Sequence, residues 1–213
     1  MTARASGRVR ARNSEETRRR ILKAATEVFA ERGFDGARVD RIAAKARINK
    51  QLLYHHFGNK DELFTAVLES EYKSIRTAEA ALDLDGLRAG EAILALVEFT
   101  WRYYLAHPDF IRLLNSENQL EARHLKASAR TREINAGHIA RMKKLLARGR
   151  REGSVRGDLD AMQLNVSIAA LGFFYLMNRH TLSTVYQRDL GSQRMLNARL
   201  AVMKDTIGRW IRP

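Results

Sequence analysis

The chain has 213 residues, of which 45% are apolar, and it carries a formal net charge of +14. This length allows one large or two modest domains, and the apolar fraction is sufficient for a buried core. Cysteine is absent, which excludes disulfides, thiolate catalysis and cysteine-based zinc sites and suits a reducing cytoplasm.

The amino terminus is rich in arginine and lacks an apolar signal core, so we expect a cytoplasmic protein without an export signal. The longest uncharged stretch, residues 161–178, contains several polar residues. It falls short of the roughly 20 mostly apolar residues that a bilayer span requires. We therefore expect a buried helix there and no membrane partner.

Basic residues are concentrated in the first 60 positions. This region holds 15 Lys or Arg against 6 Asp or Glu, so +9 of the net charge of +14 lies there. Such a region favours DNA as a partner, because binding releases the counterions condensed on the phosphate backbone. A basic surface that is merely solvated is the weaker interpretation, because the excess coincides with a helical motif in residues 42–63.

In chain order, residues 1–13 form a basic segment with few apolar side chains, which predicts a disordered arm. The arm could follow a DNA minor groove, or it could be a solvated tail without an ordered role. Ser14 is placed to cap the first helix, and Gly33 is placed to end it.

Residues 42–63 predict two short helices separated by a tight turn, followed by the start of a third. The first helix ends near Arg47, and Asn49 can cap a second helix with Leu53 and Phe57 at helical spacing. A short polar helix that follows another after a tight turn is how a helix-turn-helix presents side chains to the DNA major groove. Asn59 begins the next helix, which we expect to end near Arg76.

No strand pattern appears in the remainder, so the sequence predicts an all-α fold. The expected helices cover residues 86–106, 108–120, 131–151, 160–184 and 192–211, and residues 121–130 are ambiguous. The helix at 160–184 is apolar on two faces, so both faces must be covered. A symmetric homodimer would cover one of them, and a monomer that buries both faces internally is the alternative.

Residues 20–68 resemble the amino-terminal domain of TetR-type transcriptional regulators. The resemblance rests on Glu31-Arg32-Gly33-Phe34, Ile42-Ala43, Leu53-Tyr54-His55-His56-Phe57 and Asn59-Lys60-Asp61-Glu62-Leu63. Arg47 departs from the family pattern, which commonly has glycine in the turn, so a left-handed backbone there would cost about 1 to 2 kcal/mol. Arg38 and Leu52 also replace residues that are commonly small.

The resemblance implies a disordered arm at 1–13, a three-helix helix-turn-helix DNA-binding domain at 14–60, and a larger helical effector-binding and dimerisation domain at 61–213. It implies that Lys50, Gln51 and His55 of the recognition helix reach bases or sugars. Phosphate anchors would be Tyr54, His56 and Lys60, with Arg41 as a further one. Core packing for Tyr54 and a carbonyl cap for His56 are the alternatives. The expected DNA-binding residues are Arg41, Asn49, Lys50, Gln51, Tyr54, His55, His56 and Lys60.

The same resemblance implies a small-molecule effector, and the aromatic content suggests a partly apolar one. The residues expected to line its pocket are Trp101, Tyr104, Phe110, Asn115, Asn118, His138, Met142, Phe173, Met177 and His180. The last two helices would form the homodimer interface through Leu164, Ile168, Leu171, Tyr175, Leu196, Leu200, Met203 and Ile207.

We expect no metal and no cofactor, because the adjacent His55 and His56 point about 100° apart on a helix. No phosphate loop or nucleophile motif indicates an enzyme. The sequence therefore predicts a repressor that binds a palindromic operator as a homodimer and is released by a small molecule. A DNA-binding regulator without a small-molecule ligand, and an enzyme on a helical scaffold, remain the alternatives.

Overall fold

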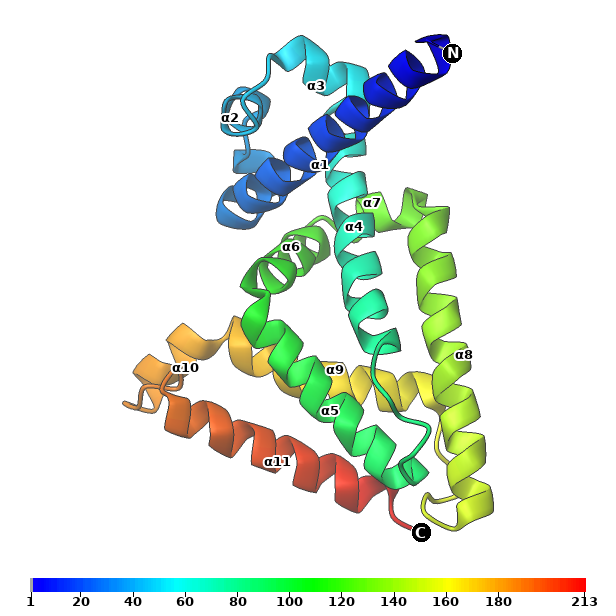
Figure 1. Ribbon diagram of the computed structural model, residues 1–213. Helices are drawn as coiled ribbons and strands as arrows, with labels where there is room; N and C mark the ends of the chain where they lie inside the picture. Colours follow the sequence, from blue (N-terminus) through cyan, green and yellow to red (C-terminus); the bar gives the residue numbers. More distant parts are fainter. Residues whose placement is uncertain (1) are drawn as a thin grey trace. The chain divides into compact units, whose positions relative to one another are not determined.

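The computed structural model describes the backbone of residues 2–213 and the side chains of residues 12–213, and within this range the regular structure is entirely α-helical (Figure 1). The all-α fold predicted from the sequence is therefore confirmed. The helices are α1 (Thr2–Gly36), α2 (Val39–Lys45), α3 (Lys50–Phe57), α4 (Lys60–Ala80), α5 (Ala89–Ala106), α6 (Pro108–Gln119), α7 (Arg123–Ala127), α8 (Ala129–Glu152), α9 (Ala161–Met177), α10 (Arg179–Val185) and α11 (Gln193–Ile211).

The chain divides into two compact units. The amino-terminal unit comprises the residues up to Glu71 together with Arg112–Ala129, and the carboxy-terminal unit comprises Tyr72–Ile111 and Arg130–Pro213. This division differs from the predicted boundary at residue 60. The first half of α4 carries Leu63, Phe64, Val67 and Leu68, which are fully buried in the amino-terminal core, so the unit extends through that half of the helix.

Three phenylalanines form the centre of the amino-terminal core. The ring centroid of Phe64 lies 4.8 Å from that of Phe29 and 5.2 Å from that of Phe34. Ile42 of α2 and Leu53 of α3 are completely buried in the same cluster. The short helices α2 and α3 are therefore held by apolar packing rather than by their own length, since helices of this size are marginal in isolation.

Helix α1 differs from the prediction at its start. It begins at Thr2, over the segment expected to be a disordered arm, and Ser14 lies within the helix rather than at its cap. Alanine and arginine, which dominate this segment, are strong helix formers, and no proline interrupts them. The side chains of residues 2–11 lie outside the described part of the chain, so the DNA contact suggested for the arm stays a prediction.

Gly33 ends the regular part of α1, as predicted. Its backbone has φ 68° and ψ 177°, a conformation that side chains with a Cβ rarely adopt. The next peptide N–H, that of Phe34, donates a hydrogen bond to Ser116 Oγ at 3.1 Å. Glycine at position 33 thus turns the chain toward Ser116 of α6, which belongs to the same unit.

The ambiguous segment 121–130 contains the short helix α7. Two consecutive residues, Glu121 and Ala122, have φ of 55° and 59°, and they reverse the chain between α6 and α7. Left-handed conformations at non-glycine residues cost free energy and persist only where surrounding contacts fix them. Here the contacts come from the buried carboxylate of Glu117, which accepts the backbone N–H groups of His124 and Leu125.

In the carboxy-terminal unit, α5, α9 and α11 pack against one another (Figure 1). Trp101 of α5, Leu164 of α9 and Met203 of α11 are buried together, and α8 adds Met142 and Leu146. Gly172 lets α9 approach α5 closely, because a Cβ at this position would lie 3.2 Å from the ring of Tyr104.

The single helix expected at residues 160–184 is in fact two helices, α9 and α10, bent by 65°. The bend falls at Asn178, whose side-chain amide donates to the carbonyl oxygen of Phe174 at 2.8 Å. An asparagine side chain that bonds the backbone in this way competes with helix continuation. No single described helix is long and apolar enough to cross a membrane, although α9 and α10 together satisfy that test by length and composition.

Candidate nucleic-acid interface and ligand pockets

The turn between α2 and α3 adopts the geometry expected of a helix-turn-helix. Asn49 caps α3, since its Oδ1 accepts the backbone N–H of Leu52 at 2.7 Å. Arg47 has φ 54°, so the left-handed backbone of the turn forms without glycine. Such a conformation costs about 1 kcal/mol for a residue with a Cβ, which the packing of the neighbouring Ala46 and Ile48 against the core offsets.

Helix α3 has one buried face and one exposed face. Leu53 and Phe57 are buried, whereas Lys50, Gln51 and His55 are exposed. Tyr54 is also exposed, at 37%, so the structure excludes the alternative that it is a core residue. A short polar helix surface of this kind has the side chains that read base edges and hold phosphates.

Lys50 is paired with an acidic residue of α2. Its Nζ lies 3.1 Å from Asp40 Oδ1 and 6.0 Å from the centre of the Tyr54 ring. The hydrogen bond and the charge of Asp40 raise the pKa of Lys50 above its ordinary value. Lys50 is therefore a positive charge at the start of α3 that is already paired with Asp40.

The other predicted anchors are distributed over α2, α3 and α4. Arg41 donates to Glu31 of α1 at 2.8 Å. Lys60 lies with its Nζ 4.7 Å from the centre of the Phe34 ring, and it donates to the carbonyl oxygen of Asp35 at 3.4 Å. These contacts orient both cations while leaving them partly exposed.

His56 lies partly buried, and no hydrogen bond from its ring to a carbonyl oxygen is found among the described residues. Burial, with the nearby charges of His55 and Arg18, lowers its pKa below the ordinary value. Arg18 itself lies over the Phe57 ring, 4.9 Å from the centroid. The sequence analysis missed Arg18, and only its position on the same α1 face as the buried Ile21 and Ala25 could have indicated it.

A second basic surface was also missed. Arg20 and Lys23 of α1 line a hollow of about 310 Å³ together with Lys45 and Arg47. Glu27 is its only acidic lining residue, and Glu27 is paired with Lys45 at 2.6 Å. This hollow adds positive charge to the helix-turn-helix, and the arginine in the turn is the sequence signal that points to it.

A partly buried polar cluster joins α4 to the segment after α6, with Glu117 and His124 buried and Asp61 and Arg123 more than half exposed. Nδ1 of His124 lies 2.7 Å from Glu117 Oε2, and its Nε2 lies 3.3 Å from Asp61 Oδ1 in the first turn of α4. Arg123 pairs with the same Asp61 oxygen at 2.8 Å. Buried polar groups need partners of this kind, because an unpaired one costs about 1 to 3 kcal/mol.

The residues predicted to bind an effector do not form one site. Trp101, Tyr104, Phe110, His138 and Met142 are buried in the carboxy-terminal unit. Burial raises the pKa of Tyr104 to about 12. Phe173 and Met177 of α9 are half-buried, and His180 of α10 is exposed.

Asn115 and Asn118 belong to the amino-terminal unit, whereas the other candidates belong to the carboxy-terminal unit. Helix α6 passes from one unit into the other, and a prediction from sequence spacing cannot locate that passage.

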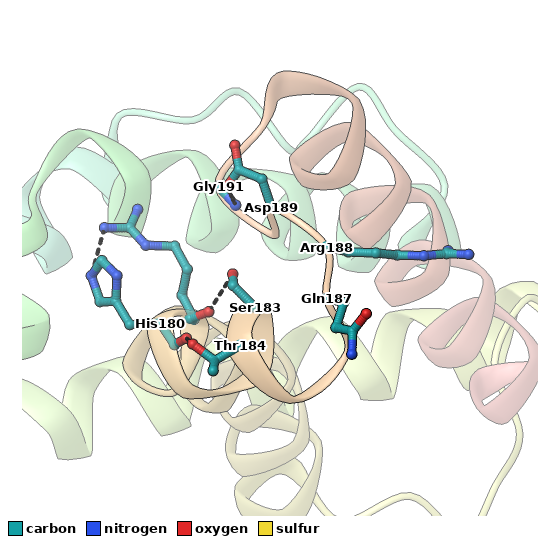
Figure 2. A pocket seen from close by; sticks show the side chains of 8 residues that line it. His180, Ser183, Thr184, Gln187, Arg188, Asp189 and Gly191 are labelled. Atoms are coloured by element: carbon teal, nitrogen blue, oxygen red, sulfur yellow. Dashed lines mark hydrogen bonds between the residues drawn. The ribbon is translucent and has the colours of Figure 1, made fainter.

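Two hollows contain some of the remaining candidates. One, of about 470 Å³, is lined by residues that include His138 and Met142. The other, of about 660 Å³, is lined by α10 and the following segment and includes His180 (Figure 2). Some of the polar groups of this second hollow bond within the chain, as the dashed lines in Figure 2 show. Ser183 Oγ donates to the carbonyl oxygen of Arg179 at 2.6 Å, and Asp189 accepts the N–H of Gly191 at 2.8 Å.

The predicted dimer residues require a correction. Five of them, Leu164, Ile168, Tyr175, Met203 and Ile207, are at most 8% exposed, because they form the core of their own chain. A side chain without exposed surface cannot contribute area to a partner. Leu171, Leu196 and Leu200 are half-buried.

The exposed apolar side of α9 is the opposite face. Met162 is 53% exposed, Val166 51% and Phe174 60%, and Val202 of α11 is 51% exposed. Both faces of α9 are apolar, so their composition does not indicate which one meets the core. Helix α9 is apolar on two sides, as predicted, and the side that holds Leu164 and Ile168 lies in the core of its own chain.

These features define a class of protein, a DNA-binding regulator with an amino-terminal helix-turn-helix and a helical body. Residues 21–67 match the family described as bacterial regulatory proteins, tetR family, and residues 90–207 match the tetracyclin repressor-like C-terminal domain. The chain is 36% identical over 204 residues, 96% of each chain, to the HTH-type transcriptional repressor NicS of Pseudomonas putida. It belongs to the TetR family of transcriptional regulators.

Further comparisons agree with this assignment. The chain is 42% identical over 104 residues to the HTH-type transcriptional repressor SCO4008 of Streptomyces coelicolor, covering 49% of this chain and 50% of that one. A solved structure of the putative transcriptional regulator SCO4942 from the same organism has a TM-score of 0.70 and 25% identity, covering 92% of this chain and 99% of its own. FadR of Bacillus subtilis, solved in complex with stearoyl-CoA, shares the fold with a TM-score of 0.68 and 19% identity, covering 91% and 98%. These relatives are regulators and not enzymes.

Proposed function

We propose that the protein is a transcriptional repressor that acts in the cytoplasm, binds a near-palindromic operator as a homodimer and is released by a small organic molecule. The observation that carries the DNA-binding part is the exposed face of α3, where Lys50, Gln51, Tyr54 and His55 are presented over a buried Leu53 and Phe57. Repression is supported by the similarity to NicS, a transcriptional repressor that is related over almost the whole chain.

In this proposal the exposed residues have two roles. Lys50 donates to guanine O6 and N7, Gln51 pairs with adenine, and His55 is a third base or sugar contact. Tyr54, His56, Lys60 and Arg41 hold phosphates and set the register. Asn49 caps α3 through its side chain, so its proposed role is to fix the start of the recognition helix.

The homodimer is proposed to form through the exposed side of α9 and α11. The side chains of Met162, Val166 and Phe174 on α9 and of Val202 on α11 are each more than half exposed. Exposed apolar surface of this kind marks sites of contact between proteins. Pairing this surface with a second copy gives a four-helix contact. The dimer places two recognition helices in successive major grooves, about 34 to 36 Å apart or somewhat more.

Release by an effector requires only that the molecule binds one spacing of the recognition helices better than the other. Helix α4 is continuous from Lys60 in the amino-terminal unit to Ala80 in the carboxy-terminal unit, so it can transmit a displacement. The FadR structure, which was solved in complex with stearoyl-CoA, supports a ligand-binding body in a protein of this fold.

The proposal is tested by gel-shift titration of the protein on DNA from upstream of its own gene. We expect a saturable shifted complex whose affinity falls steeply with salt. Gln51→Ala is expected to relax base preference in a selection from random oligonucleotides. The absence of any specific complex at low ionic strength would overturn the proposal, whatever ligand is tested.

A further inference from the structure

The hollow of about 470 Å³ in the carboxy-terminal unit has walls of aliphatic side chains. It lies between the end of α4, the following segment, α5 and α8. Its apolar lining consists of Ala80, Leu82, Leu84, Leu96, Met142 and Leu145. This volume and composition are in the range of pockets that bind small organic molecules.

The inner end of this hollow is polar and already charge-balanced. Glu79 and His138 are buried, with Glu79 Oε1 2.7 Å from His138 Nδ1, and Arg76 bonds the other carboxylate oxygen. The other ring nitrogen of His138, Nε2, lies 2.6 Å from Asn165 Oδ1. Both carboxylate oxygens of Glu79 are already bonded, one by His138 and the other by Arg76. This end of the hollow therefore offers no unpaired charge to a cationic or an anionic ligand.

The rim of the hollow, in contrast, carries an excess of positive charge. Four cations line it, Arg141, Lys144, Arg148 and Arg151, against one acidic rim residue, Asp85. Arg148 is committed to the carbonyl oxygens of Leu84 and Leu87 and to Glu152. Arg141 lies 3.7 Å from Glu79 Oε1 and is half exposed.

Two of the rim cations, Lys144 and Arg151, are exposed, and no ion pair to either is found among the described residues. The rim therefore has positive charge that the chain does not neutralise. A positive rim around an apolar interior selects a molecule with one acidic group and an apolar body.

Resting on the proposed function, we infer that this hollow is the effector site and that its ligand is a small organic carboxylate, with the acid at the Arg141–Lys144 rim and the apolar body against the leucines. A neutral hydrogen-bond donor at the inner end of the ligand would face Glu79. The hollow at α10 does not compete, because its Ser183 and Asp189 already bond within the chain and its lining has no large apolar side chain.

The test measures ligand binding to the full-length protein by calorimetry, without DNA. The probes are hexanoate, octanoate and phenylacetate. Each carboxylate is compared with the neutral amide and the primary amine that have the same carbon skeleton. We expect at least one carboxylate to bind saturably and at least about tenfold more tightly than its amide, with the amine weakest, and the preference to shrink at high salt. No saturable binding by any carboxylate, or equal binding of acid and amide, would overturn the inference.

Variants locate the site. The double variant Arg141→Gln, Lys144→Gln is expected to weaken carboxylate binding about tenfold while leaving amide binding unchanged. Lys143→Gln is the matched control, because Lys143 is the exposed neighbour of Lys144 and does not line the hollow. All three positions are exposed, so the fold is retained, as a thermal melt checks. An equal loss of carboxylate affinity in the control and in the double variant would overturn the assignment of the site.

Operator binding is then measured separately with the carboxylate that binds best. Binding in the hollow without release of DNA leaves the carboxylate site standing and contradicts effector release. Release of DNA by amides or amines alone, unaffected by the double variant, supports effector release and contradicts the carboxylate site.

Discussion

Asp40 and Lys50 face each other across the turn of the helix-turn-helix, with Nζ 3.1 Å from Oδ1. The pair has two opposite effects on DNA binding. It orients the lysine at the start of α3, and it places a negative charge where phosphates approach. In the complex the lysine must leave the carboxylate or share it with an acceptor on DNA.

Asp40→Asn is therefore expected to strengthen DNA binding by about threefold at low salt, because it removes a competing charge while keeping a hydrogen-bond acceptor. Asp83→Asn is the matched control, since it makes the same charge change at an exposed position of the other unit. Gel-shift titrations of both variants at two salt concentrations provide the measurement. Weaker binding by Asp40→Asn would show that orientation of Lys50 outweighs competition.

Lys50→Ala and Lys60→Ala are expected to change DNA binding in two different ways. Loss of Lys50 should relax preference at particular base pairs, because its amine is proposed to contact bases. Loss of Lys60, at the start of α4, should weaken binding to all sequences alike and reduce the salt slope by about one. Binding to a specific and a random duplex across a salt series checks this. Identical profiles for the two variants would contradict the proposed division between base and phosphate contacts.

Ser116→Ala should destabilise the amino-terminal unit. Ser116 Oγ accepts the buried N–H of Phe34 at 3.1 Å, and its removal leaves that donor without an acceptor. The expected cost is about 1 to 2 kcal/mol of unfolding free energy. Chemical denaturation measures it, and Ser74→Ala is the control because Ser74 is exposed. DNA affinity should fall with stability at elevated temperature, and an unchanged denaturation midpoint would exclude a structural role for this bond.

Glu79 gives the carboxy-terminal unit an acid sensitivity. Burial raises its pKa, but the hydrogen bond from His138 and the charge of Arg76 outweigh burial, so its pKa in the folded protein lies below the ordinary 4.5. The stabilisation is therefore complete above about pH 4.5 and is lost as the pH falls through the folded value. Glu79→Gln should cost about 3 kcal/mol at neutral pH, because it leaves Arg76 and His138 without their anion.

The difference in melting temperature between wild type and Glu79→Gln should narrow as the pH is lowered below 4.5. Thermal melts from neutral to acidic pH measure it. Glu133→Gln serves as control, since Glu133 is exposed on α8. A constant difference across this range would show that the carboxylate charge is not what stabilises the folded state.

The features that the sequence predicts well are the local ones. Asn49 caps α3, and Leu53 and Phe57 lie at helical spacing, so the helix-turn-helix follows from contacts between residues a few positions apart. The packing of the later part of α6, from Arg112, in the amino-terminal unit could not be predicted, because the bond that shows it joins Phe34 to Ser116 across 82 positions. A buried hydrogen bond between residues so far apart produces no periodic pattern in the sequence from which it could be predicted.

The two faces of α9 illustrate a second limit. Leu164 and Ile168 face the core, whereas Met162 and Val166 face outward, and both pairs are equally apolar. Hydrophobic spacing then predicts that both faces are covered, but it contains no information on which neighbour covers each one. Only packing against Trp101 and Met203, on helices distant in sequence, determines the orientation.

That orientation leads to a test of the proposed dimer. Phe174→Arg combined with Val202→Arg places two charges on the outward face and should convert the dimer into a monomer, because burying unpaired charges in an interface costs several kcal/mol. Both side chains are more than half exposed in the single chain, so the fold of the monomer should be retained. Leu87→Arg, at another exposed apolar residue, is the matched control.

Sedimentation equilibrium gives the mass, and gel shifts on a palindromic site give the consequence. A monomer contacts one half-site, so the double variant should lose most of its operator affinity while retaining binding to random DNA at low salt. An unchanged dimer mass would place the interface elsewhere on the molecule. A monomeric wild-type protein would remove the need for any second subunit on this face, and a palindromic operator would then have no structural basis.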